Sequence, residues 1–109
     1  MAAFDPEKFE DKYVHYFTEL QRAYKNAFET MRDSYDSDLV HAIDQRVLNE
    51  SEPFYEDGSF RVELPEEPAK RVEGSGVPVD EETLEAALDD YVAEIESELY
   101  RVLGVDREE

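Results

Sequence analysis

Residues 53–64 have the sequence Pro53-Phe54-Tyr55-Glu56-Asp57-Gly58-Ser59-Phe60-Arg61-Val62-Glu63-Leu64. Apolar and polar residues alternate in its second half, which is the period of a strand with one buried face. The pair Asp57-Gly58 predicts a tight hairpin turn, because glycine accepts a positive φ at little cost. We therefore expect two antiparallel strands, the second of which would bury Phe60, Val62 and Leu64.

The chain before this hairpin carries a helical pattern. Over residues 6–33 the apolar residues recur at steps of three and four, and no glycine or proline follows Pro6. Asp5 is suited to cap such a helix, and Pro6 to begin it. Twenty-eight helical residues would extend about 42 Å, which is long for a compact domain of this size. We therefore expect this helix to protrude, to bend or to meet a second copy of the chain.

Two further helices are predicted on either side of the hairpin. A short one is expected over residues 37–48 and a second long one over residues 81–103, each with apolar residues along one face. The expected caps are Asp36 or Ser37 for the first helix, and Asp80 and Gly104 for the second.

The remaining segments are expected to be irregular. Residues 65–78 contain three prolines and two glycines, which is typical of a connection without regular structure. Val77 and Val79 could add a short third strand, and residues 107–109 are expected to be a frayed tail. The sequence thus predicts one α+β domain over residues 1–109, with the order α-α-β-β-α.

Negative charge dominates the composition. Thirty acidic residues against 11 basic ones give a formal net charge of −19, and only four of the basic residues are lysines. In ordinary salt this self-repulsion opposes compaction, whereas at about 1 M salt the Debye length is only about 3 Å. We interpret the surface as adapted to the cytoplasm of a halophile, where it would attract cations nonspecifically. Intrinsic disorder and nucleic-acid mimicry are the alternative explanations of such acidity.

The sequence holds no signature of an enzyme, a cofactor or a membrane protein. There is no cysteine and no apolar run long enough to span a membrane, and from the first residues we expect no secretory signal. His15 and His41 are expected to face solvent, and the carboxylates near His41 are too few for a metal site. We therefore expect a non-enzymatic protein that needs no metal and no cofactor.

A DNA-binding regulator of the winged-helix type is the alternative function, because two helices followed by a hairpin resemble that fold. The basic residues it could use are few and are interrupted by acidic ones, so nucleic acid is an unfavoured partner. They are Lys8, Lys12, Arg22 and Lys25 on the first helix, Arg61 on the hairpin, and Lys70 and Arg71 in the following loop.

The first helix is the candidate contact surface for a protein partner. Residues 6–33 hold five basic and six acidic side chains, whereas residues 34–109 carry a net charge of −17. Six of the 13 aromatic residues also lie in this first segment. Interface cores are enriched in aromatic residues and depleted of acidic ones, so we expect an adaptor or a homodimer that uses this helix. The alternative is that the helix is simply the centre of the core. The candidate anchors are Tyr13, Tyr16, Phe17, Tyr24 and Phe28.

Four stretches carry a resemblance. They are Asp5-Pro6-Glu7-Lys8-Phe9-Glu10-Asp11-Lys12-Tyr13, Glu19-Leu20-Gln21-Arg22-Ala23-Tyr24-Lys25-Asn26-Ala27-Phe28, Leu39-Val40-His41-Ala42-Ile43-Asp44-Gln45 and Asn49-Glu50-Ser51-Glu52-Pro53-Phe54-Tyr55. On these residues the chain resembles a small, uncharacterised haloarchaeal protein family over nearly its whole length. The resemblance implies a halophilic archaeal origin and brings no activity or site residues.

Overall fold

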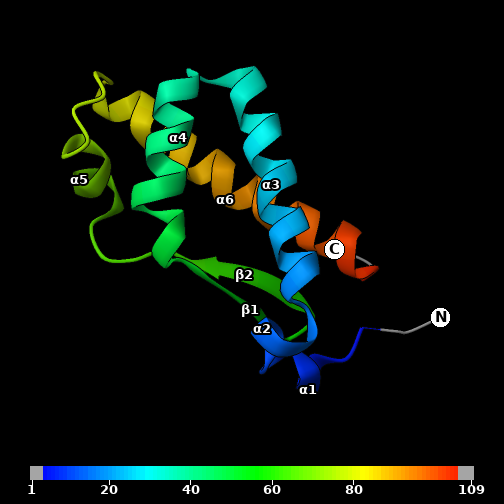
Figure 1. Ribbon diagram of the computed structural model, residues 1–109. Coiled ribbons are helices and arrows are strands. Elements are labelled where there is room, and N and C mark those ends of the chain that lie inside the picture. The colour runs from blue at the N-terminus through cyan, green and yellow to red at the C-terminus, as the bar shows by residue number, and fades with distance from the viewer. Residues whose placement is uncertain (1–3, 106–109) are drawn as a thin grey trace.

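The computed structural model describes residues 4–105 of the chain. It confirms an α+β fold in which helices lie before and after a two-stranded antiparallel hairpin (Figure 1). In chain order the elements are α1 (Pro6–Phe9), α2 (Lys12–His15), α3 (Phe17–Ser34), α4 (Ser37–Arg46), the 3-10 helix η1 (Leu48–Glu50), β1 (Glu52–Glu56), β2 (Ser59–Glu63), α5 (Pro68–Glu73) and α6 (Glu81–Leu103).

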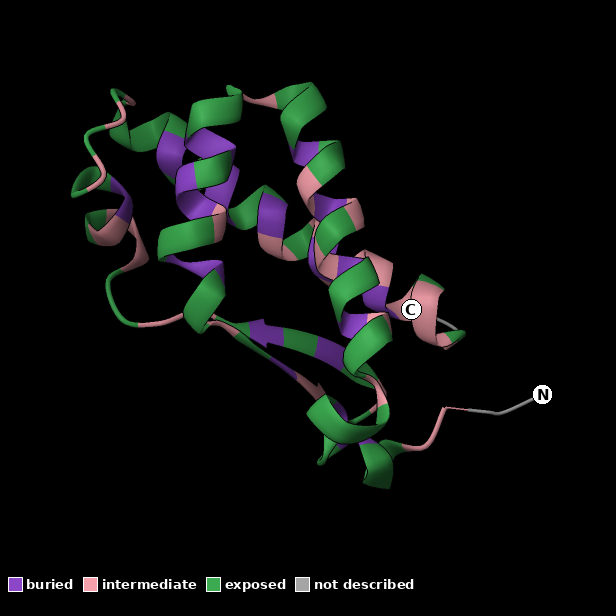
Figure 2. Ribbon diagram, viewed as in Figure 1, coloured by how far each residue is buried: buried purple, intermediate pink, exposed green. Residues whose placement is uncertain are grey.

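The packing of α3 against α6 forms the centre of the fold. Ala23 and Ala27 of α3 are completely buried, and such small side chains allow two helices to approach closely. Tyr91, Ile95 and Leu99 of α6 are also completely buried, and burying a large apolar side chain contributes about 1.5–3 kcal/mol. In Figure 2 both helices carry buried segments, drawn in purple, alternating with exposed ones. The two long helices therefore supply about half of the buried apolar residues, and α4 adds Leu39, Val40, Ala42 and Ile43.

The ends of α4 and α6 follow from capping residues. The Asp36 carboxylate accepts hydrogen bonds from the backbone N–H groups of Asp38 and Leu39, at 2.8 and 3.4 Å. Asp80 accepts one from Thr83 at 2.7 Å, and Gly104 ends α6 with a φ of 68°. The predicted bounds of α6 are confirmed. The helix predicted over 37–48 is two residues shorter, because the chain tightens into η1 before it enters β1.

The hairpin forms at the predicted turn. Asp57 and Gly58 both have a positive φ, 51° and 81°, which is the backbone of a type I′ turn. Phe60 and Val62 are buried as predicted, and Leu64 is half-buried beyond the end of β2.

Side chains of α6 cover the outer edge of β2. The backbone N–H of Phe60 donates to the Tyr100 hydroxyl, and that of Val62 donates to the Glu96 carboxylate, both at 3.0 Å. Unpaired N–H groups on a strand edge would otherwise be open to pairing with another chain. The helix therefore both buries one face of the hairpin and satisfies its edge.

A single continuous helix over residues 6–33 is wrong, but the expected alternative that this segment bends is confirmed, because the structure divides it into α1, α2 and α3. The backbone leaves the helical region at Asp11, with φ −108° and ψ 44°, and again at Tyr16, with φ −128° and ψ 21°. No proline or glycine causes these breaks. The cause is tertiary: the breaks allow Phe9 to turn toward the hairpin, where its ring lies 5.5 Å from that of Phe60, and Tyr16 packs on Phe9 at 6.1 Å.

The connection over residues 65–78 is not wholly irregular as predicted, because it contains α5. Val72 of this helix is completely buried, and α5 packs against α4 and α6. Val77 and Val79 form no strand within the described part of the chain. The tail predicted over residues 107–109 lies outside the described residues.

Candidate functional site

The candidate anchors of the first helix divide into exposed and half-buried residues. Tyr13 and Phe17 are 56% and 50% exposed, and the neighbouring Val14 is 79% exposed. We call these three residues the junction patch, because they lie where α2 meets α3. Large apolar side chains that are exposed together mark contact surfaces more reliably than scattered ones. Val14 was not predicted, and the break at Tyr16 leaves it on α2 whereas Phe17 begins α3.

The other three predicted anchors make contacts within the fold. The Tyr16 hydroxyl accepts a hydrogen bond from the backbone N–H of Asp5 at 3.0 Å. The Tyr24 hydroxyl is hydrogen bonded to Ser51 at 3.1 Å, and the ring of Phe28 lies 5.8 Å from that of His41. These residues are half-buried and position the helix. Tyr13 and Phe17 therefore remain the anchors most available to a partner.

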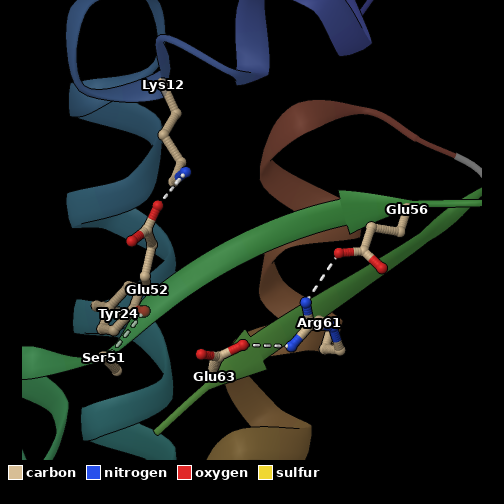
Figure 3. Close-up of polar contacts among 7 residues, drawn as sticks. All are labelled: Lys12, Tyr24, Ser51, Glu52, Glu56, Arg61 and Glu63. Atoms are coloured by element: carbon tan, nitrogen blue, oxygen red, sulfur yellow. Dashed lines mark hydrogen bonds and ion pairs between the residues drawn. The ribbon is translucent and has the colours of Figure 1, made fainter. Parts of the chain in front are cut away.

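Lys12 immediately precedes the junction patch in the chain and contacts the ring of Tyr13. Its side chain is 5% exposed, and its ammonium donates to the Glu52 carboxylate at 2.9 Å (Figure 3). The ammonium also faces the rings of Phe9 and Tyr13 at 5.4 Å and of Phe54 at 4.9 Å. A cation that is removed from water in this way is stabilised by the electron-rich ring faces and by its counter-charge. The expectation that Lys12 offers a surface cation is therefore wrong, since the hairpin buries it.

A shallow hollow lies between α3 and α4. Tyr24 and Asp44 lie in its wall, and burial raises the pKa of Tyr24 to about 12. Burial also raises the pKa of the Asp44 carboxyl, and the charge of His41 opposes this shift. Tyr91 is completely buried, and this burial raises the pKa of its hydroxyl. The nearby negative charge of Asp44 raises the same pKa further. The hollow is lined by Gln21, Tyr24, Lys25, Asp44, Gln45, Leu48 and Asn49.

Buried phenols near a carboxylate could serve acid–base chemistry, but their positions do not favour it. Tyr91 is completely buried, so a substrate in the hollow would not reach its hydroxyl. A general acid or base must come within hydrogen-bond reach of the reacting proton. The Tyr91 hydroxyl therefore offers no reactive group to this hollow.

Arg61, Lys70 and Arg71, the basic residues that the DNA-binding alternative takes from the hairpin and the following segment, are engaged by carboxylates. Arg61 donates to Glu56 and Glu63, both at 2.8 Å (Figure 3). Lys70 lies 3.3 Å from Glu67, and Arg71 pairs with Glu50. Phosphate contacts are the main source of affinity for nucleic acid, and these three cations would first have to leave their partners.

The described residues do not form a metal-binding group. Between residues 4 and 105, no three His, Cys, Asp or Glu side chains are placed to hold one ion. Both histidines are exposed, as predicted, and His41 is hydrogen bonded to Gln45 at 3.1 Å. No helix in the described range has the length and apolar character needed to cross a bilayer.

Comparison with known proteins places the chain in a family. The model of DUF5783, a family of unknown function, matches residues 1–106, so the chain belongs to this family. No curated protein and no solved structure matches the chain. The family thus supports the resemblance to an uncharacterised group and leaves the function to be argued from the surface.

Proposed function

We propose that this member of DUF5783 acts through protein–protein contact, and that its junction patch joins two copies of the chain. One observation carries the proposal: Tyr13, Val14 and Phe17 are large apolar side chains that are all exposed within residues 13–17. Each would lose contact with water if a second copy covered it, and such burial is favourable in proportion to the apolar area removed. Aromatic residues at the centre of an interface are also the usual energetic anchors.

The charge distribution supports a second copy as the partner. Each chain carries a net charge of −19, so two copies repel one another wherever their acidic surfaces meet. The segment over residues 6–33 is almost neutral, with five basic and six acidic side chains. A two-fold arrangement of patch against patch would bring these neutral segments together and keep the acidic surfaces apart. Self-association at any other face would have to overcome more repulsion.

The proposed setting is the cytoplasm of a halophilic archaeon, where the contact would be non-enzymatic. Concentrated salt shortens the Debye length to a few ångströms and screens the remaining repulsion between the two copies. Apolar contacts are not weakened by this screening, and kosmotropic salts strengthen them. A small apolar patch in an acidic surface is thus suited to association in concentrated salt.

Light scattering during size-exclusion chromatography in about 2–3 M KCl tests the proposal. We expect a dimer for the natural chain and a monomer for the double variant Val14→Ser, Phe17→Ser. Val77→Ser is the matched control, because Val77 is a half-exposed valine that lines a different hollow, near Tyr35 and Leu39. A natural chain that stays monomeric at every concentration, or a double variant that dimerises as well as the control, would refute the proposal.

A further inference from the structure

We infer that the two copies exchange their N-terminal arms, defined as residues 4–16, so that each arm packs on the hairpin of the other chain. This inference rests on the proposed function, because it needs a dimer. In the exchanged state α2 and α3 would form one straight helix, and Tyr16 would be the hinge. Arm exchange reproduces contacts already present within one chain, which makes it an inexpensive route to a dimer.

The sequence around the hinge permits the straight helix. No glycine or proline occurs between Pro6 and the end of α3, and the apolar period of three and four continues through the break. Tyr16 caps α3 with its backbone only, since no side chain among the described residues bonds to the first turn at this point. In a straight helix the first N–H groups of α3 would gain carbonyl partners from α2. Local energetics therefore favour the straight form, and tertiary contacts alone hold the bend.

Those tertiary contacts join the arm to a part of the chain that is distant in sequence. The ring of Phe4 lies 4.9 Å from that of Tyr55 and 5.4 Å from that of Phe60. Phe9 lies 5.5 Å from Phe60, and Lys12 donates to Glu52 across the same gap. Every one of these partners lies on the hairpin, which the arm of a second copy could approach as well as its own. Exchange would thus keep the aromatic cluster and the buried ion pair intact.

The junction patch lies where exchanged chains would pass one another. Tyr13 and Val14 precede the hinge, and Phe17 follows it directly. The new contacts of an exchanged dimer form around the hinge, because the arm contacts themselves are unchanged. Tyr13 and Phe17 of the apolar stripe and the neighbouring Val14 are exposed on the two sides of the bend in a single chain. A second straight helix beside them would cover this exposed surface.

Two introduced cysteines can report which chain each arm contacts. Glu10 of the arm and Glu56 of the hairpin are exposed and line the same hollow, and the chain has no cysteine of its own. The variant Glu10→Cys, Glu56→Cys would be treated with a short bismaleimide in concentrated KCl and run on a denaturing gel. Exchange predicts that covalent dimers are the main product. The two single-cysteine variants measure chance crosslinking between molecules.

A proline at Thr18 separates exchange from simple dimerisation. Thr18 is exposed and lies in the first turn of α3, where proline is tolerated in the bent chain. In a straight helix the proline ring would clash with the carbonyl of Val14, four residues earlier. Thr18→Pro in the double-cysteine chain should therefore shift the product from covalent dimer to crosslinked monomer, whereas the matched Thr18→Ala should not.

The outcomes distinguish the inference from the proposed function. A solution dimer that yields only crosslinked monomer would overturn exchange and leave patch-to-patch dimerisation standing. A chain that is monomeric in solution would overturn both. If Thr18→Pro fails to fold, the product of the double-cysteine chain in its natural background still decides between the two arrangements.

Discussion

The ammonium of Lys12 lies 2.9 Å from the Glu52 carboxylate, and the two side chains are 5% and 47% exposed. The pair joins α2 to β1 across 40 residues of sequence. Because the carboxylate is half in water and the ammonium is not, the lysine bears most of the desolvation cost. Three aromatic rings around the ammonium offset part of that cost.

This asymmetry predicts an order of stability among variants of the pair. Lys12→Met should cost less than about 1.5 kcal/mol, because methionine fills the space between the rings and leaves Glu52 hydrated. Lys12→Ala should cost about 2–4 kcal/mol, since it opens a cavity there. Glu52→Gln should also lower the free energy of unfolding more than Lys12→Met does, because it leaves the buried ammonium without its counter-charge. Urea unfolding in concentrated KCl measures the order, and equal losses for methionine and alanine would contradict it.

The hydroxyl of Tyr91 predicts a stabilising substitution. Within the described part of the chain it is buried without a hydrogen-bond partner. A buried polar group without a partner costs about 1–3 kcal/mol, so Tyr91→Phe should raise the free energy of unfolding by about 1 kcal/mol. Tyr24→Phe is the matched control, because the Tyr24 hydroxyl is bonded to Ser51 and its loss should cost about 1 kcal/mol. The same sign for both variants in thermal unfolding would contradict this reasoning.

Asp44 and Asp80 should affect stability with opposite dependence on pH. Burial raises the pKa of the Asp44 carboxyl in the folded chain above its ordinary value of 3.8. The charged carboxylate therefore destabilises the fold, and stability is lost as pH rises from 3.8 through the folded pKa. The hydrogen bond from the Thr83 N–H holds the pKa of the Asp80 carboxyl below 3.8 in the folded chain. The Asp80 carboxylate therefore stabilises the fold above pH 3.8, and this contribution is lost as pH falls through the folded pKa.

Asparagine substitutions test this difference. At neutral pH, relative to the natural chain, Asp44→Asn should raise the free energy of unfolding and Asp80→Asn should lower it. Both differences should shrink toward zero in acid, where the natural carboxyls are protonated. Urea titrations at neutral and acidic pH give the two differences, and a difference that persists unchanged in acid would show that the carboxyl charge is not its cause.

Salt is expected to stabilise the fold. The Debye length falls from about 10 Å at 0.1 M salt to about 3 Å at 1 M, so the repulsion among 30 acidic side chains should weaken and the melting temperature should rise with KCl. The exposed Glu85 and Asp89 of α6 offer a control, because Glu85→Gln with Asp89→Asn should reduce the rise. A chain that melts at the same temperature in dilute buffer would contradict the interpretation of a halophilic surface.

Local signals predicted the elements that depend on a few neighbouring residues. The turn at Asp57-Gly58 and the cap at Asp80 were predictable because their geometry is set within two or three residues. Two of the candidate contact residues, Tyr13 and Phe17, were also found exposed. The position of α5 was missed because proline and glycine dominate its surroundings, although Val72 anchors it in the core.

By itself the sequence determined the class of the fold, the caps and turn, the two apolar stripes and the strongly acidic surface, since each arises from the identity and spacing of nearby residues. Only the tertiary structure decided that the first helix bends at Tyr16, that Lys12 is buried, and that Tyr13, Val14 and Phe17 are left exposed. The physical reason is that these outcomes depend on contacts with the hairpin, about 40 residues away in the chain. A helical period depends only on nearby residues, so it cannot predict contacts with residues so distant in the chain.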